Sequence, residues 1–439
     1  MIRTLRQYLL LALLLFVAQG VLAQTTLIEH KVKKKETIFG IARDYGITLQ
    51  QLIDVNPQMN APGYQLKKDE VLKIPITANY TAKSASALGH TIRLGVMLPL
   101  HNLNGDGHRM VEYYRGILMA CDSMKREGIS VDVRAWNLAE NGDPTEILND
   151  KSTQQLDIII GPLYSKFMEP LSNFVKKHDI MLVVPFSINA PQLASNKNIF
   201  QIYQAPVNLT DVTARRCAEW FRDYHPIIVD CHDNTSSKGD FTTALRRQLE
   251  QNDILYNVTS LNTAEDNFAK AFLANVPNLV ILNTARSPEL QRTFNRLKNL
   301  TARRPNLEIS VFGYTEWLMY VNQQQQNFHR FNVYIPSYFY TNMQSPMAIR
   351  LERYYEAQFG QSMQQSLPRF ALTGFDHAVF FLRGLHKYGK KFDGMTGRFS
   401  YQPVQTPLWF EHIAGGGHQN RAYMFVHYKP DGSIETINY

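Results

Sequence analysis

Few residue groups in this sequence combine side-chain types and spacings that could support catalysis or metal binding. His101 and His108 flank the polar run 102–107, which has some features of a metal-binding loop. His418 follows three glycines, 415–417, and this group is more typical of a flexible turn. The motifs GxSxG, GxxxxGK followed by Ser or Thr, HExxH, HxH and CxxC do not occur. Their absence favours a protein without enzyme activity, and we predict neither a metal nor a cofactor.

The cysteines do not describe a disulfide scaffold. There are three, Cys121, Cys217 and Cys231, and their number is odd. A bridge between Cys217 and Cys231 is one alternative in an oxidising compartment. Buried free thiols are the other, and the sequence favours them.

The first residues have the organisation of a secretory signal peptide. Arg3 and Arg6 precede the apolar run 8–17, and Val21 and Ala23 are small residues at the spacing that signal peptidase requires. An uncleaved membrane anchor is the alternative, but the apolar run is short for a bilayer span. With no cysteine near Ala23, a lipoprotein anchor is not expected. We therefore predict a cleaved signal at 1–23, no later membrane segment, and a mature protein in the periplasm or cell envelope.

The net charge points weakly to a partner. The formal charge is +8, but lysines and arginines are spread along the chain and form no basic tract interleaved with aromatic residues. This distribution gives little support to nucleic-acid binding. A mildly basic surface suits anionic wall polymers, although it can also be ordinary solvated surface.

The chain divides into four blocks. The signal is followed by a compact unit at 27–76, a small polar linker at 77–90, and a long block at 91–439. In the long block, apolar strand-like runs alternate with amphipathic helical runs. The expected strands are 92–98, 129–136, 156–161, 180–184, 199–202, 227–230, 255–258, 279–282 and 307–312.

Continuous apolar strands separated by amphipathic helices predict parallel sheets that helices cover on both faces. Two such series predict an α/β fold of two doubly wound lobes, one at about 91–204 and 334–392 and the other at about 205–333 and 393–439. Ligands of such sheets bind beyond the carboxyl ends of the strands. We therefore expect a cleft between the two lobes.

The compact unit resembles the LysM family along its length. The matching segments are HKVKKKETIFGIARDYGITLQQLIDVNP at 30–57 and VLKIP at 71–75. The residues agree with the βααβ form of that family, because Ile38, Ile41 and Tyr45 lie on one helical face and Gly46 can end that helix. Thr48 can cap a second helix.

The resemblance to LysM implies binding of peptidoglycan or another glycan that contains N-acetylglucosamine. The implied groove residues are Glu36, Thr37, Ile38, Asn56, Pro57 and Gln58. Two departures from the family pattern bear on affinity. Lys35-Glu36-Thr37 stands for the usual Gly-Asp-Thr, and Asp69 replaces a later glycine that tolerates positive φ. The alternative is a module that is kept only as structure.

The long block resembles type I periplasmic binding proteins of the leucine- and amide-binding kind. The matching segments, in order, are 92–100, 116–120, 157–165, 180–187, 374–385 and 394–399, and Asp431-Gly432 closes a last hairpin. In these relatives, loops at the strand ends hold the ligand. The implied cleft residues here are Tyr164, Ser165, Ser187, Asn189, Asn234, Ser236, Tyr314 and Glu316.

Within this resemblance, Glu316 is expected to neutralise a ligand amine, and the loop 101–108 falls where relatives have a polar cleft loop rather than a metal site. Ile188-Asn189 departs from the usual arrangement after Ser187, which argues against an amino-acid ligand. Serine and asparagine also populate ordinary capping loops, so a structural role is the alternative for each residue.

Three functions follow from the two resemblances. The first is a non-enzymatic envelope protein that binds peptidoglycan and uses the cleft to sense a small polar ligand or to dock a cell-wall partner, since some proteins of this lobe fold activate wall synthases. The second is the solute-binding component of an ABC-type amino-acid or amide uptake system. The third, a LysM-bearing wall hydrolase, lacks the motifs that it requires.

Overall fold

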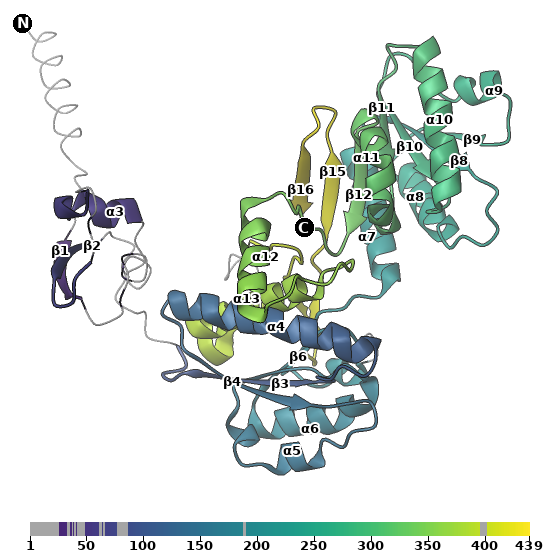
Figure 1. Ribbon diagram of the computed structural model, residues 1–439. Helices are drawn as coiled ribbons and strands as arrows, with labels where there is room; N and C mark the ends of the chain where they lie inside the picture. The colour runs from purple at the N-terminus through teal and green to yellow at the C-terminus, as the bar shows by residue number, and fades with distance from the viewer. Residues whose placement is uncertain are drawn as a thin grey trace, which may run out of the picture. The chain divides into compact units, whose positions relative to one another are not determined.

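The small N-terminal unit is built on a two-stranded sheet. The computed structural model describes residues 26–32, 36, 38, 41, 49–60, 64, 66–76, 87–187, 190–395 and 402–439. Strand β1 (Thr26–Lys31) pairs antiparallel with β2 (Val71–Ile76) (Figure 1). Between them lie the helix α3 (Leu49–Asp54) and the 3-10 turn η1 (Pro57–Asn60), and Ile38 and Ile41 are helical.

The apolar positions predicted for this unit form its core. The buried residues are Val32, Ile41, Leu52, Met59, Leu72 and Ile74, with Ile38 and Ile53 packed against them. The predicted signal peptide 1–23, the linker residues 77–86, and Tyr45, Gly46 and Thr48 lie outside the described residues.

The first sheet of the large body has the order β13-β14-β7-β6-β5-β3-β4. All neighbours are parallel except β13 and β14. Helices α4 and α13 lie on one side of the sheet and α5 and α6 on the other (Figure 1). The strands are β3 (Ile92–Leu98), β4 (Val131–Asn137), β5 (Ile158–Ile160), β6 (Met181–Val184), β7 (Ile199–Gln201), β13 (Phe410–His412) and β14 (His418–Asn420). The helices are α4 (Gly105–Arg126), α5 (Thr145–Asn149), α6 (Met168–His178) and α13 (Phe370–Tyr388).

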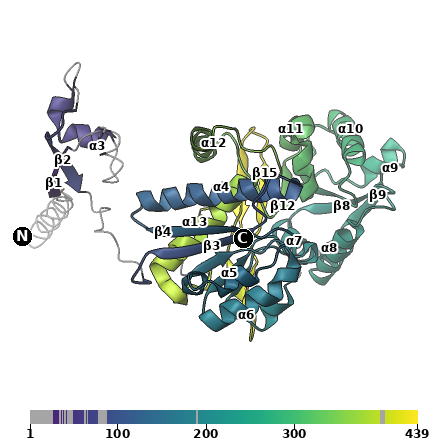
Figure 2. The same cartoon turned by 60° about the horizontal axis from the view of Figure 1, so that its bottom comes forward.

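The second sheet has the order β16-β15-β12-β11-β10-β8-β9, with parallel pairing from β9 to β12 and an antiparallel hairpin of β15 and β16 at its edge. Helices α10 and α11 lie on one side and α7 and α8 on the other (Figure 2). The strands are β8 (His225–Asp230), β9 (Asn257–Ser260), β10 (Asn278–Leu282), β11 (Ile309–Phe312), β12 (Val333–Ser337), β15 (Met424–Tyr428) and β16 (Ile434–Asn438). The helices are α7 (Pro206–Trp220), α8 (Gly239–Gln251), α9 (Glu265–Lys270), α10 (Ser287–Arg303) and α11 (Val321–Arg330). Helix α12 (Pro346–Phe359) follows the crossing after β12 and contacts α4 of the first lobe, where Tyr355 donates its hydroxyl to Glu112.

Strand pairing differs from the expected lobe boundaries at two points. We expected residues 334–392 in the first lobe and 393–439 in the second, but β12 pairs with β11 and β15 in the second sheet, and β14 pairs with β7 in the first. The chain thus passes between the sheets at 202–205, 338–345 and 421–423. The segment His418-Gln419-Asn420 has no apolar pattern that could have indicated a central strand.

Gly416 and Gly417 are closely packed, which corrects the expectation of a flexible turn at 415–417, whereas Gly415 is exposed. Gly417 N donates to Leu193 O at 2.7 Å, and Gly416 N donates to Ile413 O at 2.8 Å. A Cβ on Gly416 would lie 2.2 Å from Leu193 O, so only glycine fits there. This turn sets the position of β14 beside β7.

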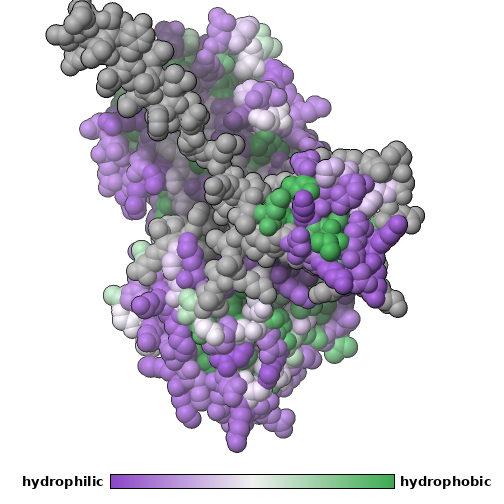
Figure 3. Space-filling model, turned by 90° about the vertical axis from the view of Figure 1, so that its left-hand side faces the viewer, coloured by the Kyte–Doolittle hydropathy of each residue, from purple (hydrophilic) through white to green (hydrophobic). Residues whose placement is uncertain are grey.

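The surface is mainly polar where it can be followed. The face shown in Figure 3 is mostly hydrophilic, and apolar residues form small groups between polar ones. Within the part of the chain that the structure describes, no helix combines the length and apolar character needed to cross a membrane.

Candidate binding sites

Part of the predicted glycan groove can be placed. Pro57 and Gln58 are exposed at the start of η1, where they are free to contact a ligand. On the other side, Glu36 lies 2.8 Å from His30 Nε2, and Ile38 is half-buried against the core of the unit. Thr37 lies outside the described residues.

Asn56 has a structural role that the sequence did not indicate. Its side chain is 2% exposed. The amide Nδ2 donates to Leu52 O at 2.8 Å and to Lys73 O at 2.6 Å, and Oδ1 accepts from Lys73 N at 2.8 Å. These bonds fasten the end of α3 to β2, so the side chain is occupied internally. The Asn56 side chain is therefore not available to a glycan.

Asp69 occupies the left-handed backbone position that the family pattern assigns to glycine. Its φ is 67°, and its N–H donates to Val32 O at 2.8 Å. Aspartate is one of the residues that tolerate this region best. The turn before β2 is thus retained in spite of the substitution.

In the first lobe, the predicted residues follow the carboxyl ends of β5 and β6. Tyr164 is half-buried and donates its hydroxyl to Asp106 Oδ2 at 3.1 Å. Burial and this hydrogen bond raise the pKa of Tyr164 to about 12. Ser165 is exposed at the start of the 3-10 turn η3 (Ser165–Phe167), and Ser187 is half-buried and accepts from Gln201 Nε2 through its carbonyl. Asn189 lies outside the described residues.

In the second lobe, the predicted polar groups are mostly engaged with the protein itself. Tyr314 is 5% exposed and donates its hydroxyl to Leu282 O. Glu316, which was expected to neutralise a ligand amine, pairs with Lys238 Nζ at 2.7 Å. Ser236 Oγ accepts from Lys238 N at 3.0 Å, and Asn234 is exposed.

A cavity of about 530 Å³ lies at the carboxyl edge of the second sheet. Two of the predicted residues line it, Tyr314 and Glu316, whereas Ser165 and Ser187 do not. Ser237, which the position after the strand 227–230 indicated together with Asn234 and Ser236, also lines it. The residues that sequence reasoning left out of the site are Leu209, Thr210, Thr213, Lys238, Asp240, Phe241, Thr315, Met319, Pro336, Tyr338, Phe339 and Leu367. Position after β8 could have indicated Lys238. The crossing segment after β12 carried no such signal, because it was assigned to the other lobe.

The lining of this cavity is mainly apolar and aromatic. Phe241, Tyr314 and Tyr338 form part of the wall, and Met319 is 61% exposed beside them. Lys238 Nζ lies 5.1 Å from the centre of the Tyr314 ring while it pairs with Glu316. Such a cavity suits an apolar group better than a free charge.

The histidines considered for metal binding and two of the cysteines have structural surroundings. His101 Nδ1 accepts from Leu103 N at 3.3 Å, and His108 Nε2 lies 3.0 Å from Asn102 O. Among the described residues, no three His, Cys, Asp or Glu side chains gather as metal ligands would. Cys217 and Cys231 are buried free thiols, and burial raises the pKa of Cys231 to about 12.

Comparisons with known proteins support both parts of the chain. Residues 30–75 match the LysM domain family. A structure described as a candidate branched-chain amino acid ABC transporter from Rhodospirillum rubrum has a TM-score of 0.53 at 14% identity, over 79% of this chain and 100% of the other. At this identity the similarity concerns the fold alone, which is that of type I periplasmic binding proteins.

Two further structures are more distant in shape. A substrate-binding protein from Desulfitobacterium hafniense in complex with Leu has a TM-score of 0.40 at 13% identity, over 79% of this chain and 100% of the other. Full-length LpoA from Haemophilus influenzae has a TM-score of 0.48 at 14% identity, over 82% of this chain and 62% of the other. A comparison with the curated proteins finds no matching sequence.

Proposed function

We propose that this chain, which joins a LysM domain to a body with the type I periplasmic binding protein fold, is a non-enzymatic protein of the bacterial cell envelope. Its LysM domain binds peptidoglycan, and its large body binds an apolar group of a small ligand or of a wall-associated partner protein. The match of residues 30–75 to the LysM family is the observation that carries this proposal. The signal-like residues 1–23 support export to the periplasm.

Exposed Pro57 and Gln58 supply a testable glycan contact. An exposed proline ring can pack against a sugar face, and the Gln58 amide can pair with an acetamido group. Neither side chain belongs to the core of the domain. A change at Gln58 should therefore weaken glycan binding without unfolding the unit.

Sedimentation with insoluble peptidoglycan tests the wall attachment. The mature chain should pellet, and a chain that lacks residues 24–76 should pellet much less. Gln58→Ala should reduce the pelleted fraction, whereas Lys67→Ala, another exposed residue of the same domain, should leave it unchanged. Equal pelleting of the truncated chain would refute the proposed role of the LysM domain.

The cavity of the second lobe supplies the second test. Because its lining is apolar and Met319 is exposed at it, Met319→Lys should abolish binding of an apolar group there. Crosslinking of the wild-type protein and this variant in intact cells would show which envelope proteins depend on the cavity. A crosslinking pattern identical in both would argue against a docking role.

Solute binding for uptake is the second candidate, and the fold shared with the Rhodospirillum rubrum structure favours it. An apolar cavity can also accept a branched aliphatic side chain. Thermal unfolding with leucine, isoleucine, valine and muropeptides separates the two functions. A ligand at 100 times its Kd should add about 2.7 kcal/mol of stability, and an effect from the free amino acids alone would favour uptake.

A further inference from the structure

A second cavity, of about 390 Å³, lies at the opposite edge of the first sheet. It is lined where strands begin: Asp157 precedes β5, Met181 opens β6 and Asn198 precedes β7. Since these strands are parallel, this edge is the amino edge, away from the loops that carry Tyr164 and Ser187. We call it the basal cavity. Its lining residues are Asp157, Asp179, Met181, Lys197, Asn198, Phe200, Leu385, Lys390, Lys391, Phe392, Asp393, His412 and His418.

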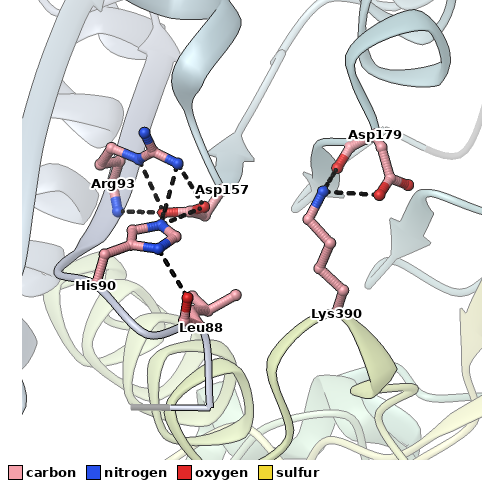
Figure 4. Close-up of polar contacts among 6 residues, drawn as sticks. All are labelled: Leu88, His90, Arg93, Asp157, Asp179 and Lys390. Carbon is pink, nitrogen blue, oxygen red and sulfur yellow. Dashed lines mark hydrogen bonds and ion pairs between the residues drawn. The ribbon is translucent and has the colours of Figure 1, made fainter. Parts of the chain in front are cut away.

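Two carboxylates of the basal cavity are held by cations (Figure 4). Asp157 accepts from Arg93 Nη2 at 3.1 Å and Arg93 N at 2.8 Å, and His90 Nε2 lies 3.0 Å away. Burial opposes ionisation of Asp157, but these hydrogen bonds lower its pKa below the usual value. Asp179 pairs with Lys390 Nζ at 2.7 Å, which lowers its pKa as well. Both carboxylates are therefore charged at neutral pH and already compensated.

The charged groups that line the cavity are balanced in number, and one of its cations is left without an ion pair among the described residues. Its three lysines balance its three aspartates, and Arg93, bound to Asp157, adds one more cation. Lys197 is exposed and lies close enough to Asp179 to lower the pKa of that carboxyl, yet it forms no ion pair with any residue that the structure describes. A ligand carboxylate would gain most beside Lys197.

The floor of the cavity is apolar and includes a buried histidine. Phe200, Phe392 and Leu385 contribute to the lining. His418 is 9% exposed and stacks on Phe200 with ring centroids 4.2 Å apart. Burial lowers the pKa of His418 to about 4, so the ring is neutral at pH 7. Hydrogen bonds with the backbone of Lys197 and Ile199 oppose this lowering, so the ring is engaged with the wall of the cavity.

The chain that arrives from the LysM domain enters the large body beside this cavity. Ala87 N donates to His386 O at 2.8 Å, and His90 Nδ1 lies 2.8 Å from Leu88 O while its Nε2 faces Asp157. Asp157 thus lines the cavity and also fixes the end of the linker (Figure 4). A ligand in the cavity would lie next to the point of attachment.

We propose that the basal cavity is a second binding site, for a short peptide that carries free carboxylate and amino groups, the chemistry of peptidoglycan stem peptides. Lys197 binds the carboxylate, Asp393 attracts the amino group, and small side chains lie against the apolar part of the lining. That the peptide comes from the cell wall rests on the proposed function. The assignment of the cavity as a binding site does not depend on it.

Calorimetric titration of the full mature chain with the tripeptide L-alanyl-γ-D-glutamyl-meso-diaminopimelate tests this site. Lys197→Ala removes one charge-assisted contact and should weaken binding about tenfold. Lys151→Ala, an exposed lysine of the same lobe outside the cavity, should bind as the wild type does. Because Lys197 is exposed and unpaired, both variants should keep the wild-type unfolding temperature.

Several outcomes separate this proposal from the wall attachment. Gln58→Ala should reduce peptidoglycan pelleting but keep tripeptide affinity, since the two sites share no residue. No heat of binding at millimolar tripeptide, or equal affinities in Lys197→Ala and the wild type, would overturn the basal site. Tripeptide binding that is lost in Met319→Lys but kept in Lys197→Ala would place the peptide in the other cavity and would also overturn it.

Discussion

At the scale of single residues, several polar side chains work inside the fold rather than at a ligand. His377 on α13 is 1% exposed, and its Nδ1 lies 2.8 Å from the hydroxyl of Tyr113 on α4. Its Nε2 has no partner among the described residues. Burial lowers the pKa of His377 to about 3 and keeps the tyrosine hydroxyl protonated. This pair is therefore neutral, and acidification should destabilise the fold because it favours the protonated histidine.

The sign of the pH effect follows from the two states of His377. Below about pH 6.5 the unfolded chain binds a proton at this site, whereas the folded chain does not until about pH 3. The free energy of unfolding should therefore decrease as the pH is lowered through this window, by up to about 1.4 kcal/mol per pH unit. His377→Gln should show a shallower fall in urea titrations at several pH values. Equal slopes in both proteins would contradict the assignment.

Asn56 gives a prediction about the stability of the LysM domain. Asn56→Ala would leave the N–H and carbonyl groups of Lys73 without their side-chain partner, at about 1–3 kcal/mol each if they stay buried. A domain of this size has little stability to lose, so it should unfold. Amide hydrogen exchange in β2 should then become fast, and peptidoglycan pelleting should be lost. Gln58→Ala should affect pelleting alone.

At the scale of elements, the crossing of α4 and α13 depends on two glycines. A Cβ on Gly116 would lie 1.9 Å from Ala371 O, and one on Gly374 would lie 2.0 Å from Tyr113 O. The two backbones are thus in direct contact, and each glycine makes room for the other helix. The same crossing contains the Tyr113–His377 pair, so these helices form one packed unit on the sheet.

Gly116→Ala should lower the free energy of unfolding by about 2 kcal/mol or more, because the added methyl cannot be placed without moving a helix. Gly239→Ala is the matched control, since Gly239 opens α8 and a Cβ there meets nothing within 4 Å. It should be neutral or stabilising by up to about 1 kcal/mol. Chemical denaturation measures both. Similar losses of unfolding free energy in the two variants would show that the close contact of α4 and α13 is not the cause.

At the scale of the whole molecule, the LysM domain and the large body have separate cores. The buried cluster of the small unit runs from Val32 to Ile74, and the buried apolar residues of the large body begin at Ile92. Each core is therefore closed by its own elements, and neither should need the other to fold.

A chain limited to residues 87–439 should therefore unfold at the same temperature as the large body of the full protein, within about 2 °C. Differential scanning calorimetry of both chains measures this. A lower unfolding temperature in the shorter chain would indicate that the N-terminal unit stabilises the body.

The sequence by itself determined what depends on local periodicity. The apolar spacing around Ile41 and Leu52 identified the LysM core, and apolar runs identified the strands β3 to β11 and their coverage by helices. It also placed Tyr314 and Glu316 at the carboxyl edge of a sheet, where the larger cavity lies. These features follow from which face of a segment is buried, and the order of residues records that directly.

Only the tertiary structure decided which distant segments meet. Periodicity does not specify a strand's neighbour, so β14 beside β7 and β12 in the second sheet could not be foreseen. Nor does the type of a polar residue reveal its partner: Asn56 bonds to Lys73, and Glu316 to Lys238. The basal cavity assembles residues 157 to 418 from separate elements. Its charge balance exists only once the chain has folded.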